Sequence, residues 1–101
     1  MSLFELAPGA EDDVWDIWQY LALQAGSEIA SRVESELFDA FTNLTQAPNI
    51  GHRRTDLTTR PVLFYTLYSY LIIYVPDTSP LQIIAVLHGK RNVKRILADR
   101  M

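Results

Sequence analysis

The sequence predicts an α+β fold in which two helices come first and a small antiparallel sheet follows. Two long segments in the first half repeat apolar residues at three- and four-residue intervals, which is typical of amphipathic helices. Three shorter segments in the second half are dense in branched aliphatic and aromatic residues, which is typical of strands. With 101 residues the chain has room for one hydrophobic core, so we expect a single domain over residues 1–101.

A short strand is expected at residues 3–6, where apolar and polar side chains alternate before Pro8-Gly9 ends the run. The first helix should follow, because apolar side chains recur with helical spacing as far as Ala25. Acidic residues crowd its first turn, where the helix dipole favours negative charge. These residues are Glu11, Asp12 and Asp13. We expect them, like the other acids of the helices, to lie on the helix exteriors.

A second helix is expected after Gly26, which would end the first. Ser27 would act as its N-cap, its apolar stripe would run from Ala30 to Leu44, and Pro48 would stop it. Because the joint is so short, the two helices should form an antiparallel hairpin whose apolar faces need a cover.

The cover should be a sheet from the second half of the chain. After a polar loop at residues 49–60, three segments have strand composition and are joined by turns too short for a parallel crossover. We therefore expect a three-stranded antiparallel meander, with strands at residues 62–67, 70–75 and 82–87.

A short C-terminal helix should close the chain, with Asn92 as its cap and Val93, Ile96 and Leu97 facing inward. So short a segment does not stay helical alone, so it must dock on the rest of the molecule or on a partner.

Charge is unevenly divided along the chain. Residues 1–50 hold nine acids and one base, a charge of −8, whereas residues 51–101 hold eight bases and three acids, a charge of +5, and the sum is the net −3. We expect the helical hairpin to be anionic and the loop, the meander and the last helix to converge on one cationic corner. That corner should contact the target.

The densest cluster of chemically active residues is the segment His88-Gly89-Lys90-Arg91 at the end of the last predicted strand. Imidazole beside two cations suits phosphate binding or acid–base chemistry on RNA. The alternative is a glycine turn whose two cations are simply solvated. The loop bases Arg53 and Arg54 have the same two interpretations, since they either join this corner or pair with acids.

Aromatic residues offer a second set of candidates. The tyrosines of the meander either stack on bases or fill the core, and the core is the more common role for strand tyrosines. Trp15 and Trp18 share one side of the first helix, so Trp18 can join the core stripe while Trp15 lies at its edge. An exposed tryptophan would suit protein docking. The tyrosines concerned are Tyr65, Tyr68, Tyr70 and Tyr74.

Several classes of function have no motif in this sequence. It contains no cysteine, and its two histidines are far apart and not flanked by carboxylates, so we expect no metal site and no cofactor. There is no glycine-rich phosphate loop and no Gly-x-Ser-x-Gly motif. The beginning of the chain lacks the features of a signal peptide, and no window is apolar enough to span a membrane, so we expect a cytoplasmic protein.

The chain resembles the RelE/ParE superfamily of bacterial toxins, and within it the ParE-like or plasmid-stabilisation branch. The resemblance runs from Leu6-Ala7-Pro8-Gly9 through Ile17-Trp18-Gln19-Tyr20-Leu21 to the end of the second helix. Its most specific parts are the strand Tyr70-Leu71-Ile72-Ile73-Tyr74 and the segment Val86-Leu87-His88-Gly89-Lys90-Arg91-Asn92.

The resemblance implies a toxin that arrests growth and is neutralised by an antitoxin encoded beside it. ParE-like members are similar to proteins that poison DNA gyrase without hydrolysing anything, and this is our first hypothesis. RelE-like members cleave messenger RNA on the ribosome, which is the alternative. Relatives often carry an arginine in the first meander strand, where this chain has Leu63. A low pI of about 5.2 also favours a protein target over RNA. A third interpretation is a binding module that has lost toxicity.

These considerations define three sets of candidate residues. The target-binding set is His88, Lys90, Arg91, Lys94, Arg95 and Arg60. The antitoxin-binding set is Trp15, Trp18, Arg53, Arg54, Tyr65 and Arg91. If the protein cleaves RNA, the catalytic set is His88, Arg91, Lys90 and Arg60. The partner is expected to be the C-terminal segment of an antitoxin, amphipathic and net acidic, in a toxin–antitoxin hetero-oligomer.

Overall fold

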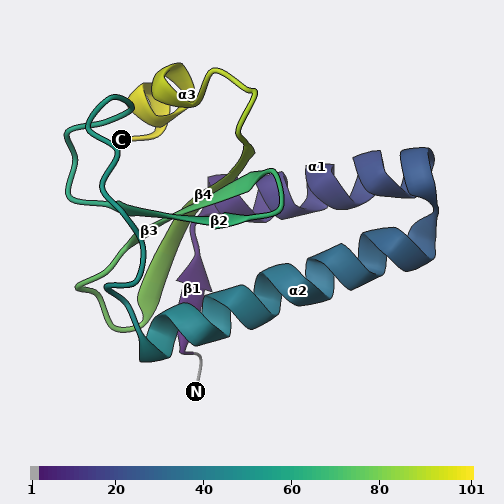
Figure 1. The fold of residues 1–101 in the computed structure, drawn as a ribbon, viewed down its shortest axis with the longest axis horizontal. Helices are drawn as coiled ribbons and strands as arrows, with labels where there is room; N and C mark the ends of the chain where they lie inside the picture. Colours follow the sequence, from purple (N-terminus) through teal and green to yellow (C-terminus); the bar gives the residue numbers. More distant parts are fainter. Residues whose placement is uncertain (1–2) are drawn as a thin grey trace.

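The structure is a computed structural model that describes residues 3–101 (Figure 1). It confirms the predicted order of an N-terminal strand, two helices, three strands and a C-terminal helix. The elements are β1 (Phe4–Leu6), α1 (Pro8–Ala25), α2 (Ser27–Gln46), β2 (Leu63–Leu67), β3 (Tyr70–Val75), β4 (Leu81–His88) and α3 (Val93–Arg100).

The four strands form one mixed sheet in the order β1-β4-β3-β2. The predicted antiparallel meander of β2, β3 and β4 is confirmed, with Leu67 opposite Tyr70 at the tight turn. The N-terminal strand adds to this meander in parallel, pairing Phe4 with Leu81 at the start of β4. β1 covers only the first part of β4, so the rest of that edge must find other partners.

Both faces of the sheet are covered. The helical hairpin α1–α2 lies on one face, and α3 with part of the 49–60 loop lies on the other (Figure 1). β3 is central and is buried on both faces along Tyr70–Tyr74, which explains why its sequence is a continuous apolar run rather than an alternating one.

A β-bulge in β4 changes which side chains face which layer. Ile83 pairs with Tyr74 and Ala85 pairs with Ile73, so Ile84 is an extra residue. As a result Ile83 and Val86 both belong to the core beneath the hairpin, although Val86 is three positions after Ile83 and not two. The bulge therefore brings Val86 to the hairpin side of the sheet.

Of the two helix N-caps predicted from the sequence, one is confirmed and the other is wrong. Asn92 caps α3 as predicted, its side chain accepting a hydrogen bond from the Arg95 N–H at 3.3 Å. Ser27, however, is the first residue of α2, and the N-cap is Gly26, with φ of 95° and no side-chain cap. This left-handed conformation, which glycine adopts freely, lets one residue join the two helices.

The 49–60 loop is anchored to the sheet at its beginning. The buried Tyr74 hydroxyl donates to the Pro48 carbonyl at 2.8 Å and accepts from the Gly51 N–H at 3.0 Å. His52 then forms an isolated bridge with Phe64 on the edge of β2. A Cβ at Gly51 would lie 2.6 Å from the Tyr74 hydroxyl oxygen, so this close approach requires glycine. None of the helices within residues 3–101 is long and apolar enough to cross a membrane.

Candidate interaction groove

A groove of about 850 Å³ lies between the helical hairpin and the end of the sheet. It exists because α1 and α2 are longer than the strands and extend past them (Figure 1). Its lining contains apolar side chains from both helices and from the sheet, together with acidic and basic groups. The apolar part comprises Ile17, Leu21, Val33, Tyr70 and Val86. The ionisable part comprises Asp13, Asp16, Arg32, His88, Lys90 and Arg91.

His88 is held in a defined orientation at one end of this groove. Its Nδ1 accepts a hydrogen bond from the Lys90 N–H at 3.1 Å, so in the neutral ring the proton is on Nε2. Its ring meets that of Tyr70 edge to face, with centroids 5.7 Å apart. Gly89 donates to the Ser69 carbonyl at 2.8 Å, which joins this segment to the β2–β3 turn.

The β2–β3 turn forms another wall of the groove and is attached to α2. Tyr68 has a φ of 55°, a conformation that is unfavourable for a large side chain. Its hydroxyl donates a hydrogen bond to the Glu36 carboxylate on α2. This hydrogen bond raises the pKa of Tyr68, with smaller contributions in the same direction from desolvation and from the negative charge of Glu36. The turn is therefore tied to the hairpin that it faces.

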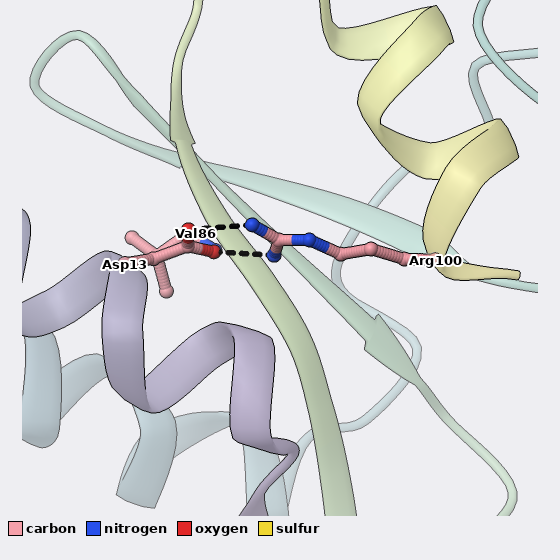
Figure 2. Close-up of polar contacts among 3 residues, drawn as sticks. All are labelled: Asp13, Val86 and Arg100. Atoms are coloured by element: carbon pink, nitrogen blue, oxygen red, sulfur yellow. Dashed lines mark hydrogen bonds and ion pairs between the residues drawn. The ribbon is translucent and has the colours of Figure 1, made fainter.

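Asp13 lies in the groove wall and is almost completely buried, with 3% of its side chain exposed. Its carboxylate accepts two hydrogen bonds from Arg100, at 2.6 and 2.8 Å, and one from the Val86 N–H at 2.9 Å (Figure 2). The hydrogen bonds to Asp13 are the largest cause of the raised pKa of Arg100, although desolvation opposes them. The carboxylate thus joins α1, β4 and α3.

The expectation that every acid of the helices lies on their exterior is wrong for Asp13. The physical reason is helical spacing, because Asp13 is three residues after Ala10 and four before Ile17 and so shares their side of α1. That spacing was visible in the sequence. What was not visible is Arg100, 87 residues away in the chain, which makes burial of the carboxylate possible.

The predicted single cationic corner is also wrong. His88, Lys90 and Arg91 line the groove, whereas Arg60 and Lys94 line a second hollow of about 430 Å³ beside α3. Hairpin geometry explains the separation, because His88 pairs with Tyr70 at one end of β3 and Leu63, three residues after Arg60, pairs with Tyr74 near the other. The two groups of bases therefore line different hollows, on different faces of the sheet.

The loop bases are engaged locally. Arg54 forms a bidentate ion pair with Asp56 at 3.0 and 2.9 Å, and this contact lowers the pKa of Asp56. Arg53 makes a long contact of 3.5 Å from Nη2 to the Thr59 carbonyl. Arg95, on α3, is exposed, and neither it nor the loop arginines lines the groove. Arg54 thus pairs with an acid of its own loop. It neither lies beside the His88–Arg91 bases nor pairs with the acids of the helices.

The two tryptophans form a stacked pair on the outside of the hairpin. Their ring centroids are 5.7 Å apart with an interplanar angle of 6°, and 55% of Trp15 is exposed. Trp18 is only partly buried, and its indole N–H donates to Ser31 Oγ on α2 at 3.2 Å. Trp18 therefore lies at the seam between the helices and not in the core stripe as expected. Tyr65, by contrast, is partly buried against the core beneath the hairpin.

Within residues 3–101 no group of three or more metal-ligating side chains comes together. The chemistry that the groove offers is recognition, with an apolar surface bordered by groups of both signs. Such a surface suits a folded or folding peptide segment more than a small polar substrate.

Comparison with known proteins identifies the family. The pattern of the ParE toxin of the type II toxin–antitoxin system parDE matches residues 4–93, and the chain belongs to this family. No curated protein matches the chain. A solved structure described as the chromosomal ParDE toxin–antitoxin system from P. aeruginosa is similar in fold, with a TM-score of 0.72 and 20% identity. The likeness covers 87% of this chain and 95% of that one.

Proposed function

We propose that this protein is a growth-arresting toxin that acts on DNA gyrase in the bacterial cytoplasm and is neutralised by its antitoxin. The observation that carries the proposal is the match of residues 4–93 to the ParE family, which includes β1 to β4 and the entire lining of the groove. Members of this family belong to toxin–antitoxin systems, so an antitoxin is the expected partner.

The charge of the groove favours a protein target over a nucleic acid. Asp16 lines it together with the bases, so a phosphate backbone would meet a carboxylate as well as cations. Arg60, which belonged to the alternative catalytic set, is in the other hollow and donates to the main-chain oxygen of Met101 at 2.7 Å. The cations available around one scissile phosphate are correspondingly fewer.

We assign target binding to the groove bases and to the bases of α3 and the second hollow, which form separate surfaces. The groove bases are His88, Lys90 and Arg91, and the others are Arg60, Lys94 and Arg95. For the antitoxin, we propose an amphipathic, net acidic segment that covers apolar surface while neutralising bases. Its contacts would be Trp15, Trp18, Arg53, Arg54, Tyr65 and Arg91, in a toxin–antitoxin hetero-oligomer.

The test is conditional expression of the full chain in a bacterial host, comparing the DNA-damage response with arrest of translation. We expect growth arrest with induction of the DNA-damage response, and purified protein should cause gyrase to accumulate cleaved DNA. Messenger RNA cut only in the presence of ribosomes would contradict the gyrase assignment. Normal growth at high soluble expression would contradict toxicity altogether.

A further inference from the structure

The C-terminal helix is tied to the molecule at its very end. Arg100, the last residue of α3, makes two charged hydrogen bonds to Asp13 of α1. The buried side chains of α3 are Val93 and Leu97, and Ile96 is partly buried. An eight-residue helix with so small an apolar face is unstable alone. The contact at Arg100 adds a polar attachment to the apolar one that Val93 and Leu97 make.

Asp13 connects this contact to the groove. Both Asp13 and Val86 line the groove, whereas Arg100 approaches from the α3 side (Figure 2). Val86 lies on the edge of β4 beyond Ile83, the last residue that pairs with β1. The Asp13 carboxylate accepts the hydrogen bond from the Val86 N–H. In a longer β1, a carbonyl of that strand would have accepted it.

The path of the Arg100 side chain is kept open by a glycine. A Cβ at Gly9 would lie 3.1 Å from three atoms of the guanidinium group, closer than most side-chain contacts. Gly9 is in the first turn of α1, one turn before Asp13. The absence of a side chain there lets the guanidinium reach the carboxylate.

Burial makes the carboxylate dependent on its cation. Asp13 is 3% exposed and Arg100 is 26% exposed, so the pair has limited access to water. An ionised carboxylate left in this position without Arg100 would be strongly disfavoured and would turn outward. That change weakens its bond to the Val86 N–H and removes this polar contact between α1 and the edge of β4.

We propose that Arg100 is a positioning residue for the groove. By neutralising Asp13 it keeps the carboxylate on the Val86 N–H and so holds the α1 wall of the groove against β4. The proposal rests on the proposed toxin function only for its growth-arrest readout. Arg100 lies outside residues 4–93 that match the ParE family, so this contact is a feature of this chain beyond the matched pattern.

Amide hydrogen exchange measured by NMR on the full chain tests this role. In Arg100→Gln we expect exchange at Val86 to accelerate at least tenfold and the signals of His88, Lys90 and Arg91 to shift. Exchange at Ile73, in the central strand, should change much less, because it reports unfolding of the whole molecule. Arg100→Lys, which keeps the charge, should restore part of the protection at Val86.

Two matched controls each remove one exposed charge and none of the hydrogen bonds between Asp13 and Arg100, on which Asp12 acts only through its charge. Asp99→Asn changes the exposed neighbour of Arg100, and Asp12→Asn changes the exposed neighbour of Asp13. Neither should accelerate exchange at Val86, whereas Asp13→Asn should. Equal acceleration at Val86 and Ile73 in Arg100→Gln would overturn the proposal, since the residue would then serve only general stability. Unchanged exchange at Val86 would overturn it as well.

Growth arrest provides the second readout. At matched soluble protein levels Arg100→Gln should arrest growth at least tenfold less effectively than Asp99→Asn, which should resemble the unmodified chain. Full toxicity in Arg100→Gln despite an open Val86 amide would contradict the positioning role. If the unmodified chain arrests no growth, the proposed function fails, and exchange at Val86 and the shifts at His88–Arg91 still decide the role of Arg100.

Discussion

The two faces of the sheet are covered by different means. On one face, helices of 18 and 20 residues bury large side chains, including Leu37, Phe41 and Leu44, which have no exposed surface. On the other face, α3 has 8 residues and buries Val93 and Leu97. The first cover is held by apolar area, whereas the second is held by a smaller apolar contact and by polar contacts at its end. The hairpin should therefore persist wherever the core persists, while α3 should be the easier element to release.

This difference also separates the two hollows. The groove beneath the hairpin contains acids and bases around an apolar lining, whereas the hollow beside α3 contains Arg60 and Lys94 among threonine and apolar residues. The protein therefore has two surfaces of different charge character. The ion pair of Asp13 and Arg100 is the polar contact that joins the two covers.

Disruption of the hairpin cover should have the largest effect. Phe41 is fully buried and contacts Phe4 and Phe38 with ring centroids 5.4 and 5.2 Å apart. Phe41→Ala should lower the free energy of unfolding by about 4 kcal/mol, because it removes apolar contact and leaves a cavity. Chemical denaturation should show one cooperative transition at lower denaturant. A loss below about 1 kcal/mol would show that the hairpin is not the main cover.

Disruption of the polar attachment should come next. Arg100→Ala should lower the free energy of local opening at the Val86 amide by about 3 kcal/mol, because a buried carboxylate loses its cation, and should lower the free energy of global unfolding by much less. Asp13→Ala should cost less, since Arg100 can extend into solvent. In the double variant the loss should be smaller than the sum of the two single losses. Additive losses in this double-mutant cycle would show that the two groups do not interact.

Tyr74→Phe should have an intermediate effect of about 1–2 kcal/mol, because the Gly51 N–H and the Pro48 carbonyl lose their partner. Burial raises the pKa of Tyr74 above its ordinary value near 10, so the folded state holds this proton more tightly than the unfolded state. That contribution is complete below pH 10 and is lost as the pH rises through the higher folded value. Denaturation as a function of pH should therefore show a smaller alkaline loss in Tyr74→Phe than in the unmodified chain.

The exposed ion pair should have the smallest effect. Arg54 and Asp56 form a well-aligned pair, yet their side chains are 44% and 62% exposed. Contact with Arg54 lowers the pKa of Asp56, so any stabilisation would be present at neutral pH and lost as the pH falls through the folded value. Solvent screening should nevertheless leave Asp56→Asn indistinguishable from the unmodified chain in thermal denaturation. A clear drop in the melting temperature would show that this exposed pair stabilises the fold as the buried Asp13–Arg100 pair does.

Much of the fold follows from local patterns in the sequence. The helical spacing of apolar residues predicted both helices, and the tight turn at Tyr68-Ser69 predicted an antiparallel neighbour for β2. The Asn92 cap was also predictable, because capping involves residues that are close in the chain. The N-cap at Gly26 was missed, since Ser27 has the typical composition of a cap and only the backbone conformation identifies the glycine.

The candidate site was predictable in part. The segment from His88 to Arg91 was identified from its composition, and the structure places its imidazole and its two cations in the groove. The assignment of Arg60 to the same surface was wrong, because β2 runs the length of the sheet between Arg60 and the groove end. Asp13 was treated as solvent-facing, because the sequence does not show which distant cation neutralises a carboxylate.

The sequence by itself determined the order and kind of the elements, the antiparallel pairing of the meander and the resemblance to ParE-like toxins. All of these depend on residues that are neighbours in the chain or on periodic patterns of a few residues. The tertiary structure alone decided how the bases are distributed between the two hollows, which tryptophan is exposed, and which arginine pairs with Asp13. These depend on contacts between residues as far apart as Asp13 and Arg100, which only the packing of the sheet between its two covers brings together.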